Sequence, residues 1–284
     1  MKYLPTLLLS LFVLTGCFSL ASARKRPAVA PAAAPAAAAK ATPPIANPNG
    51  VVMIDIGHQS TSGGAASPDG KVSEYEFWCT YAGEVKAVIE AAGYPCVVVN
   101  RSVAPTKKHV LESCRAAGVV QLNRPDKGAV RYPSKYYPQH IGCGMIAADY
   151  AIEQKARCMV FLHLNSVSSK WSDTPPTGLI ICNRKYGHGL AEAVCATMRS
   201  DILDRPGGMP NAGKGIKVLP RYIGSQPSAG WMNALDESRI PAIVFEAVYV
   251  NNRAHVDYIR NDANARKLAR TIAKGVVNWL KSNS

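Results

Sequence analysis

The chain has 284 residues, of which 48% are apolar, 18% charged and 7% aromatic, and its formal net charge is +14. This apolar content is sufficient for a buried core, which excludes a fully disordered chain. The only long apolar run, from Tyr3 to Leu20, lies at the N-terminus, so the sequence also excludes a protein that crosses a membrane many times.

Residues 1–23 are predicted to be an export signal, because a short basic start precedes an apolar stretch that ends in small residues. Two cleavage sites compete within this segment. Leu14-Thr15-Gly16-Cys17 matches the bacterial lipobox, in which the cysteine is lipid-modified, whereas Ala21-Ser22-Ala23 fits an ordinary signal-peptidase site. We expect an exported protein of the periplasm or cell envelope, and the lipobox predicts a membrane-anchored lipoprotein attached through Cys17.

Residues 24–49 are predicted to form a linker, since they contain eleven alanines, six prolines, four basic residues and no acidic residue. Frequent proline disfavours helix and favours the extended polyproline II conformation, which gives this segment a reach of about 75 Å at roughly 3.1 Å per residue. Residues 50–284 are predicted to be a single domain. Five positive charges precede it, so the domain carries a net charge of +9. An anionic polymer is therefore a natural partner, and nucleic acid is not expected, because export removes the chain from it.

Strand and helix patterns alternate along this domain. Apolar, β-branched runs predict strands at residues 51–56, 96–99, 158–164, 178–182, 215–219 and 241–250. Periodic apolar positions predict helices at residues 77–92, 106–117, 141–154, 188–203 and 268–280. Such alternation predicts an α/β fold, a single three-layer domain with a mixed, mostly parallel sheet flanked by helices.

Seven cysteines follow Cys17, and no two of them have the C-x-x-C spacing, so a zinc site made of cysteines is not expected. Several lie in apolar runs, where cysteine serves as a small buried side chain. One or two disulfides can form in an oxidising compartment, but their pairing stays open, and the odd number leaves at least one thiol.

Two histidines follow predicted strands directly. His58 comes after the first strand and His163 lies near the end of the third, at the carboxyl ends where α/β sheets place their ligand sites. Two imidazoles and one carboxylate, with a fourth position left for water, form the usual catalytic zinc site. Glu74, between a glycine-rich loop and the helix predicted to begin near Phe77, is the best candidate for the carboxylate. Glu76, two residues further on, is its competitor.

Another carboxylate, Glu246, interrupts the apolar run from Ile243 to Val248. A carboxylate buried there without a partner would cost several kcal/mol, so we expect a compensating group nearby. A water activated by the metal would compensate it, and the carboxylate can act as general base for that water.

The motifs around these residues resemble the zinc-dependent N-acetylmuramoyl-L-alanine amidases over residues 51–280. The matching pieces occur in the family's order, at residues 52–58, 73–74, 161–165 and 240–246, followed by Asn252. The resemblance implies a mixed sheet flanked by helices, zinc bound by His58, Glu74 and His163, and Glu246 as the catalytic carboxylate. It also implies hydrolysis of the amide between the lactyl group of N-acetylmuramic acid and L-alanine in peptidoglycan, the expected partner.

The sequence departs from the family pattern at three places. Gln59-Ser60 stands where the family usually has Gly-Gly, Val248 stands where it has glycine, and the basic, tyrosine-rich stretch at residues 102–140 is longer than the family norm. These departures concern substrate fit more than zinc binding. Two other functions stay open at this point, a zinc peptidase acting on stem or cross-link peptides and a catalytically inactive wall-binding lipoprotein. The sequence identifies no protein activator.

Overall fold

The computed structural model describes residues 47–58, 63–101, 105–122, 132–203, 205–210, 215–220 and 229–284. The predicted export signal, Cys17 and nearly all of the predicted linker lie outside these residues. None of the helices that the structure describes is long and apolar enough to cross a membrane.

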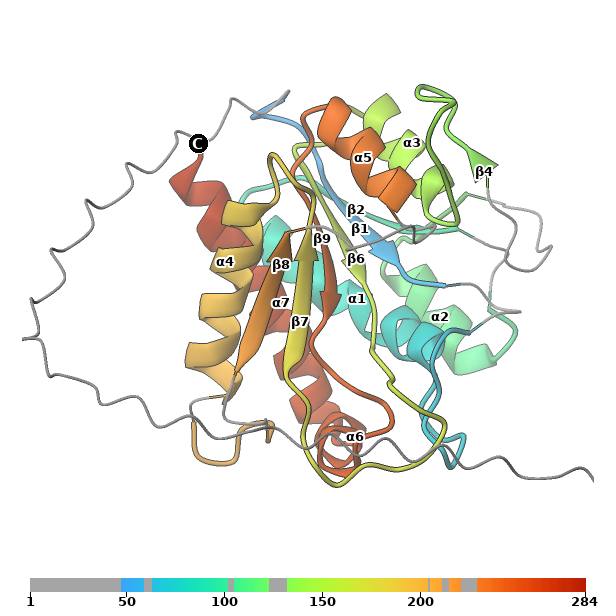
Figure 1. Ribbon diagram of the computed structural model, residues 1–284, viewed down its shortest axis with the longest axis vertical. Helices are drawn as coiled ribbons and strands as arrows, with labels where there is room; N and C mark the ends of the chain where they lie inside the picture. The colour runs from blue at the N-terminus through green and yellow to red at the C-terminus, as the bar shows by residue number, and fades with distance from the viewer. Residues whose placement is uncertain are drawn as a thin grey trace, which may run out of the picture. The chain divides into compact units, whose positions relative to one another are not determined.

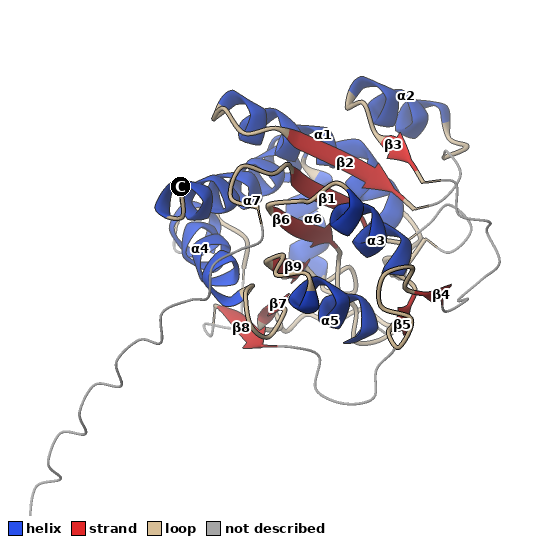
Figure 2. Ribbon diagram, turned by 90° about the horizontal axis from the view of Figure 1, so that it is seen from above, coloured by secondary structure: helices blue, strands red, loops and turns tan. Residues whose placement is uncertain are grey.

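A sheet forms the centre of the domain (Figure 1), and its seven strands lie in the order β3-β2-β1-β6-β9-β7-β8 (Figure 2). Its first five strands are parallel, whereas β7 is antiparallel to β9 and parallel to β8. The sheet strands are β1 (Val52–Ile56), β2 (Cys96–Asn100), β3 (Val120–Gln121), β6 (Cys158–Leu162), β7 (Gly178–Cys182), β8 (Ile216–Pro220) and β9 (Ala242–Glu246). The predicted mixed, mostly parallel sheet is therefore confirmed.

Helices cover both faces of this sheet and give the three layers (Figure 2). One face carries α1 (Glu74–Ala91), α4 (His188–Met198) and α7 (Asp262–Ser282), and the other carries α3 (Met145–Glu153) and α5 (Ala229–Glu237). The remaining elements are α2 (Lys108–Ala116) beside α1, the π-helical turn η1 (Arg199–Leu203) after α4, α6 (Arg253–Arg260) before α7, and a separate antiparallel ribbon of β4 (Tyr132–Pro133) and β5 (Ile141–Gly142).

The domain has two apolar cores, one on each face of the sheet, because successive side chains of a strand point to opposite faces. In β1, Ile54 belongs to the core under α1, α4 and α7, and its neighbour Met53 belongs to the core under α3 and α5. All five residues of β1 and of β6 are buried. Near-continuous apolar runs of this kind are typical of parallel strands covered on both faces, which is why the sequence located them.

The structure corrects several predicted boundaries. Helix α1 begins at Glu74 and not near Phe77. Strand β9 ends at Glu246, because beyond it Val248 accepts a hydrogen bond from the backbone of Asn165 (2.7 Å) instead of extending the pairing with β7. Helices α5 and α6 were not predicted, and both lie in segments to which the sequence analysis assigned no helix or strand.

The cysteines behave as small buried side chains. Six of the seven that the structure describes are buried, and Cys143 is exposed. The structure forms no disulfide among these seven residues.

Candidate metal and catalytic site

Three side chains converge beyond the carboxyl ends of β1 and β6. Nε2 of His58 lies 3.1 Å from Oε1 of Glu74, and Nδ1 of His163 lies 2.8 Å from the same oxygen. The two imidazole nitrogens are 3.2 Å apart. Residues separated by more than one hundred positions in the sequence thus present their donor atoms within 4.8 Å of one another.

The pairing of the central strands explains why the two histidines meet. Ile56 of β1 is the register partner of Leu162 of β6, so the chain leaves both strands at the same level. Gly57 lies between Ile56, the last residue of β1, and His58, and its amide donates a hydrogen bond to the carbonyl of Leu162 (3.0 Å). A Cβ at Gly57 would lie 2.6 Å from that carbonyl and 2.7 Å from the ring of His163, so only glycine allows this approach.

Glu74 is held by the backbone as well as by the histidines. The amide of Ala65 donates to Oε2 (2.8 Å) and the amide of Leu164 donates to Oε1 (2.9 Å). Burial raises the pKa of Glu74, but hydrogen bonds with His163 and His58 outweigh it and bring the pKa to about 2. The N-terminus of α1 also favours a negative charge here, so the carboxylate is ionised at neutral pH.

The backbone around the histidines is unusual. His58 has φ = 66°, a left-handed conformation that costs a non-glycine residue about 1–2 kcal/mol. Across from it, Gly64 has φ = 74°, and a Cβ there would collide with Oε2 of Glu74 and the ring of His58. Burial lowers the pKa of His163 to about 4, although Glu74 raises it, so its imidazole is neutral at physiological pH.

This donor set fits zinc. Bonds of 2.0–2.1 Å in tetrahedral geometry place two ligand atoms about 3.3 Å apart, close to the observed separations of 2.8–3.2 Å. Imidazole nitrogens and a carboxylate oxygen that face one another have lone pairs which a single cation satisfies together. Three protein ligands characterise catalytic zinc sites, whereas structural sites have four.

Two further carboxylates, Glu76 and Glu246, lie at different positions relative to the three converging side chains. Glu76, the competing ligand, pairs with Lys107 (2.7 Å) on the outer side of α1. Glu246 is the last residue of β9, where the preceding Phe245 accepts a hydrogen bond from the amide of His163 (3.0 Å). It is therefore the neighbour of His163 across the β6–β9 ladder. Glu246 is partly exposed, which lowers the cost of its charge compared with a fully buried position.

A buried ion pair next to the site was missed by the sequence analysis. Asp55 of β1 is fully buried, and Nη2 of Arg101 lies 3.2 Å from its Oδ2. Burial raises the pKa of Asp55 to about 7, although Arg101 and His58 both lower it. The signal was present as an acid inside an apolar strand and a base directly after the neighbouring strand, but only the register brings them together.

Asn252 and His255 have structural roles. The side chain of Asn252 caps α6 by accepting from the amide of His255 (3.1 Å). His255 is 1% exposed, and its Nδ1 accepts from the amide of Tyr249 (3.1 Å) while its Nε2 donates to the carbonyl of Pro210 (2.6 Å). Burial lowers the pKa of His255 to about 4.

Comparison with known proteins agrees with this geometry. A family model described as N-acetylmuramoyl-L-alanine amidase matches residues 52–278. No curated protein sequence matches the chain significantly.

Several solved structures share the fold. N-acetylmuramoyl-L-alanine amidase AmiC2 of Nostoc punctiforme is 19% identical, with a TM-score of 0.52 over 82% of this chain and 98% of that one. The CwlD amidase from Clostridioides difficile, solved with the GerS lipoprotein, is 15% identical, with a TM-score of 0.53 over 82% of this chain and 100% of that one. An amidase from Clostridium difficile 630 is 19% identical, with a TM-score of 0.51 over 83% of this chain and 100% of that one. At these identities the likeness shows the fold alone.

Proposed function

The chain belongs to the N-acetylmuramoyl-L-alanine amidase family of zinc-dependent peptidoglycan hydrolases, and we propose that His58, Glu74 and His163 hold its zinc ion while Glu246 is the general base. The observation that carries the ligand assignment is the convergence of three donor atoms within 4.8 Å at the carboxyl edge of the sheet. The position of Glu246 beside His163 in the β6–β9 ladder supports its role.

The residues divide the chemistry between them. Zinc supplies a Lewis acid that polarises the amide carbonyl and lowers the pKa of water toward neutrality. The Glu74 carboxylate is oriented by the amides of Ala65 and Leu164, so the ligand set is positioned before substrate arrives. The Glu246 carboxylate accepts the proton of the attacking water and passes it to the alanine nitrogen as the C–N bond breaks. The products are a lactyl carboxylate and a stem peptide with a new L-alanine amino terminus.

Digestion of purified sacculi tests the reaction. The full chain is expected to release stem peptides that begin with L-alanine, while the glycan strands stay long and gain no new reducing ends. A chelator should abolish the release and added zinc should restore it. New amino termini at diaminopimelate or D-alanine would instead identify an endopeptidase, and a chain that binds sacculi without releasing any product would be a wall-binding protein.

Metal analysis tests the ligands, and Glu76 offers a matched control two residues from Glu74. Glu74→Ala is expected to empty the site, because it removes the only carboxylate of the three donors. Glu76→Ala removes an exposed ion pair with Lys107 and should keep one zinc per chain by elemental analysis. The reverse result would move the third ligand to Glu76.

The general base is tested by a variant that separates catalysis from metal binding. Glu246→Gln keeps the size of the side chain but cannot accept a proton. Turnover should fall by about two to four orders of magnitude while zinc content stays the same. Loss of zinc together with turnover, or unchanged turnover, would contradict the assignment.

A wall amidase acts outside the cytoplasm, and we infer that Cys17 anchors this one in a membrane. The support is the lipobox at residues 14–17 and the linker at residues 24–49, whose extended length carries the domain toward the wall. A modified cysteine with two or more acyl chains anchors stably, where a single chain does so only marginally. Wild-type protein should take up acyl label and Cys17→Ser should not. Soluble wild-type protein that begins at Arg24 would show use of Ala21-Ser22-Ala23 instead.

A further inference from the structure

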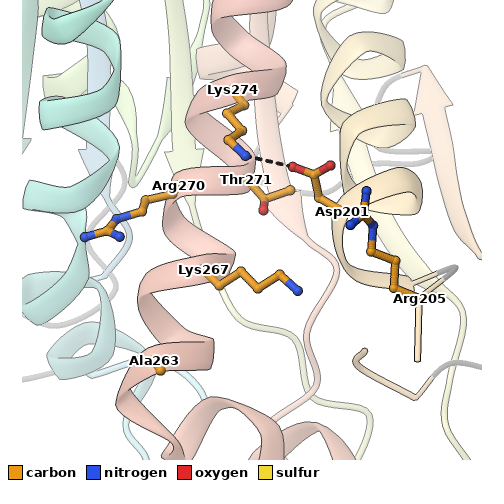
Figure 3. A pocket seen from close by; sticks show the side chains of 7 residues that line it. All are labelled: Asp201, Arg205, Ala263, Lys267, Arg270, Thr271 and Lys274. Atoms are coloured by element: carbon orange, nitrogen blue, oxygen red, sulfur yellow. Dashed lines mark hydrogen bonds and ion pairs between the residues drawn. The ribbon is translucent and has the colours of Figure 1, made fainter. Parts of the chain in front are cut away.

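A basic pocket of about 290 Å³ lies between η1 and α7, away from the zinc-site residues (Figure 3). Four of its lining side chains are cationic and one is acidic. We call this set the basic pocket, and it consists of Asp201, Arg205, Ala263, Lys267, Arg270, Thr271 and Lys274.

Three of the cations are held in place by neighbours. Lys274 lies 3.1 Å from Oδ2 of Asp201, and Nε of Arg205 donates to the carbonyl of Ser200 (2.6 Å). Arg270 donates to Glu84 of α1 (2.8 Å). These contacts fix the rim of the pocket before any ligand arrives, which lowers the entropy lost on binding.

Lys267 is the exception. It makes no hydrogen bond or ion pair with the residues that the structure describes, and Figure 3 shows its ammonium group directed into the space between α7 and η1, toward Asp201 and Arg205. Lys267, Arg270 and Lys274 are three and four residues apart on α7, and in Figure 3 Lys267 and Lys274 point toward η1 whereas Arg270 points toward α1. Like charges at this spacing destabilise a helix, so helix stability does not account for them.

We propose that the basic pocket binds a carboxylate of peptidoglycan at a distance from the bond that is cleaved, as a second attachment point for the polymer. This inference rests on the proposed function, because the stem peptides of that substrate present free carboxylates repeatedly along one polymer. The pocket is open to an anion, since Lys267 makes no ion pair with the residues that the structure describes, Arg205 bonds to a backbone carbonyl, and the domain as a whole carries +9.

Helix α1 gives the scale of the separation between the two sites. Glu74 opens α1 at the zinc site, and Glu84, ten residues later, holds Arg270 of the pocket rim. At a rise of 1.5 Å per residue, these two positions are about 15 Å apart along the helix axis. A polymer spans this distance, whereas a muramoyl dipeptide, whose two residues extend over about 7 Å at most, occupies one site at a time. Binding at both sites raises the effective concentration of the polymer at the zinc site without changing the chemistry there.

The test compares two substrates and two charge reversals in the full chain. Lys267→Glu is expected to raise the half-saturating concentration of sacculi about five- to tenfold, with unchanged kcat/KM on a soluble muramoyl dipeptide, which is too short to reach the pocket. Lys281→Glu makes the same charge change on the same helix, about 21 Å further along its axis, and should have no effect on either substrate. Lys267→Ala should give a smaller loss with the wild-type melting temperature, which excludes misfolding.

Salt and vesicles complete the test. At 0.5 M NaCl the Debye length is about 4 Å, so the difference between wild type and Lys267→Glu should disappear. Equal losses on both substrates would overturn the proposal, because Lys267 would then affect the catalytic site. Sacculus binding unchanged in Lys267→Glu, with weakened binding to phosphatidylglycerol vesicles, would also overturn it and identify a lipid headgroup as the ligand. Sedimentation with sacculi needs no turnover, so loss of binding in Lys267→Glu alongside an inactive wild type would uphold the pocket and refute the proposed function.

Discussion

Two histidines of this domain, His163 and His255, share a pKa of about 4 that burial imposes, yet their surroundings differ. Both ring nitrogens of His255 are bonded to backbone groups of Tyr249 and Pro210. In His163, Nδ1 faces Glu74 and His58, and the buried Nε2 makes no hydrogen bond with the residues that the structure describes.

The comparison shows that neither burial nor a shifted pKa identifies a functional histidine. The imidazole of His255 has no lone pair left, because its acceptor nitrogen is already bonded to an amide. Nδ1 of His163 points to two other potential metal ligands. The convergence of several potential ligand atoms on one point therefore distinguishes His163 from His255.

The largest effect is expected from replacing each histidine by glutamine. His163→Gln should lose zinc and about four orders of magnitude of activity, because the Lewis acid goes with the ligand set. His255→Gln should keep both zinc and activity per folded molecule but unfold about 3–10 °C lower, since a buried hydrogen-bond partner is worth about 1–3 kcal/mol. Elemental analysis, turnover and thermal melting of the two variants measure this. Zinc loss in His255→Gln would contradict the distinction between His163 as a metal ligand and His255 as a structural residue.

An intermediate effect is expected at Gly64, whose missing Cβ leaves room for Glu74 and His58. Gly64→Ala should lower zinc affinity about 10–100-fold, as disturbances of ligand orientation usually do. Gly70 has a similar φ of 67°, but a Cβ added there would meet nothing within 4 Å, so Gly70→Ala imposes the same backbone strain without the collision. Competition with a chromogenic chelator measures both affinities. Equal losses would mean that strain, and not the collision, disturbs the site.

The smallest effect concerns pH and stability. The pKa of His255 is lowered from 6.5 to about 4 on folding, so between these values the unfolded chain binds more protons and stability falls as pH falls. From pH 7 to pH 5 this histidine should remove about 2 kcal/mol of unfolding free energy. Urea unfolding of the metal-free wild type and of metal-free His255→Gln, each at pH 7 and pH 5, isolates the contribution of His255. The other titratable groups are the same in the two proteins, so their contributions cancel. Parallel pH profiles would show that His255 does not titrate in this range.

The parts of the fold predicted from sequence are those encoded locally. His58 and His163 were found because the strands before them are continuous apolar runs, and the polar residue that ends each run stands out. Glu74 was found from its position after a glycine-rich loop, but the sequence did not show that it is the first residue of α1. A local sequence pattern therefore predicts that a helix or strand exists more reliably than it predicts its first and last residues.

The parts that were missed depend on pairing between distant segments. The reversed direction of β7 appears only in its pairing with β9, on the side of β9 that faces away from β6. The ion pair of Asp55 and Arg101 requires the register of β1 against β2, which places Ile56 opposite Asn100. No residue pattern within one segment contains this information.

The left-handed backbone at His58 sets stability against activity at a single position. Glycine adopts φ = 66° without the steric cost that histidine has there, so His58→Gly relieves this strain but removes one of the three donor side chains and a partner of the buried Glu74. Relief of the backbone strain at position 58 thus comes only with loss of a metal ligand. Searches for hardier forms of this wall hydrolase must therefore screen for turnover at every round and hold position 58 fixed.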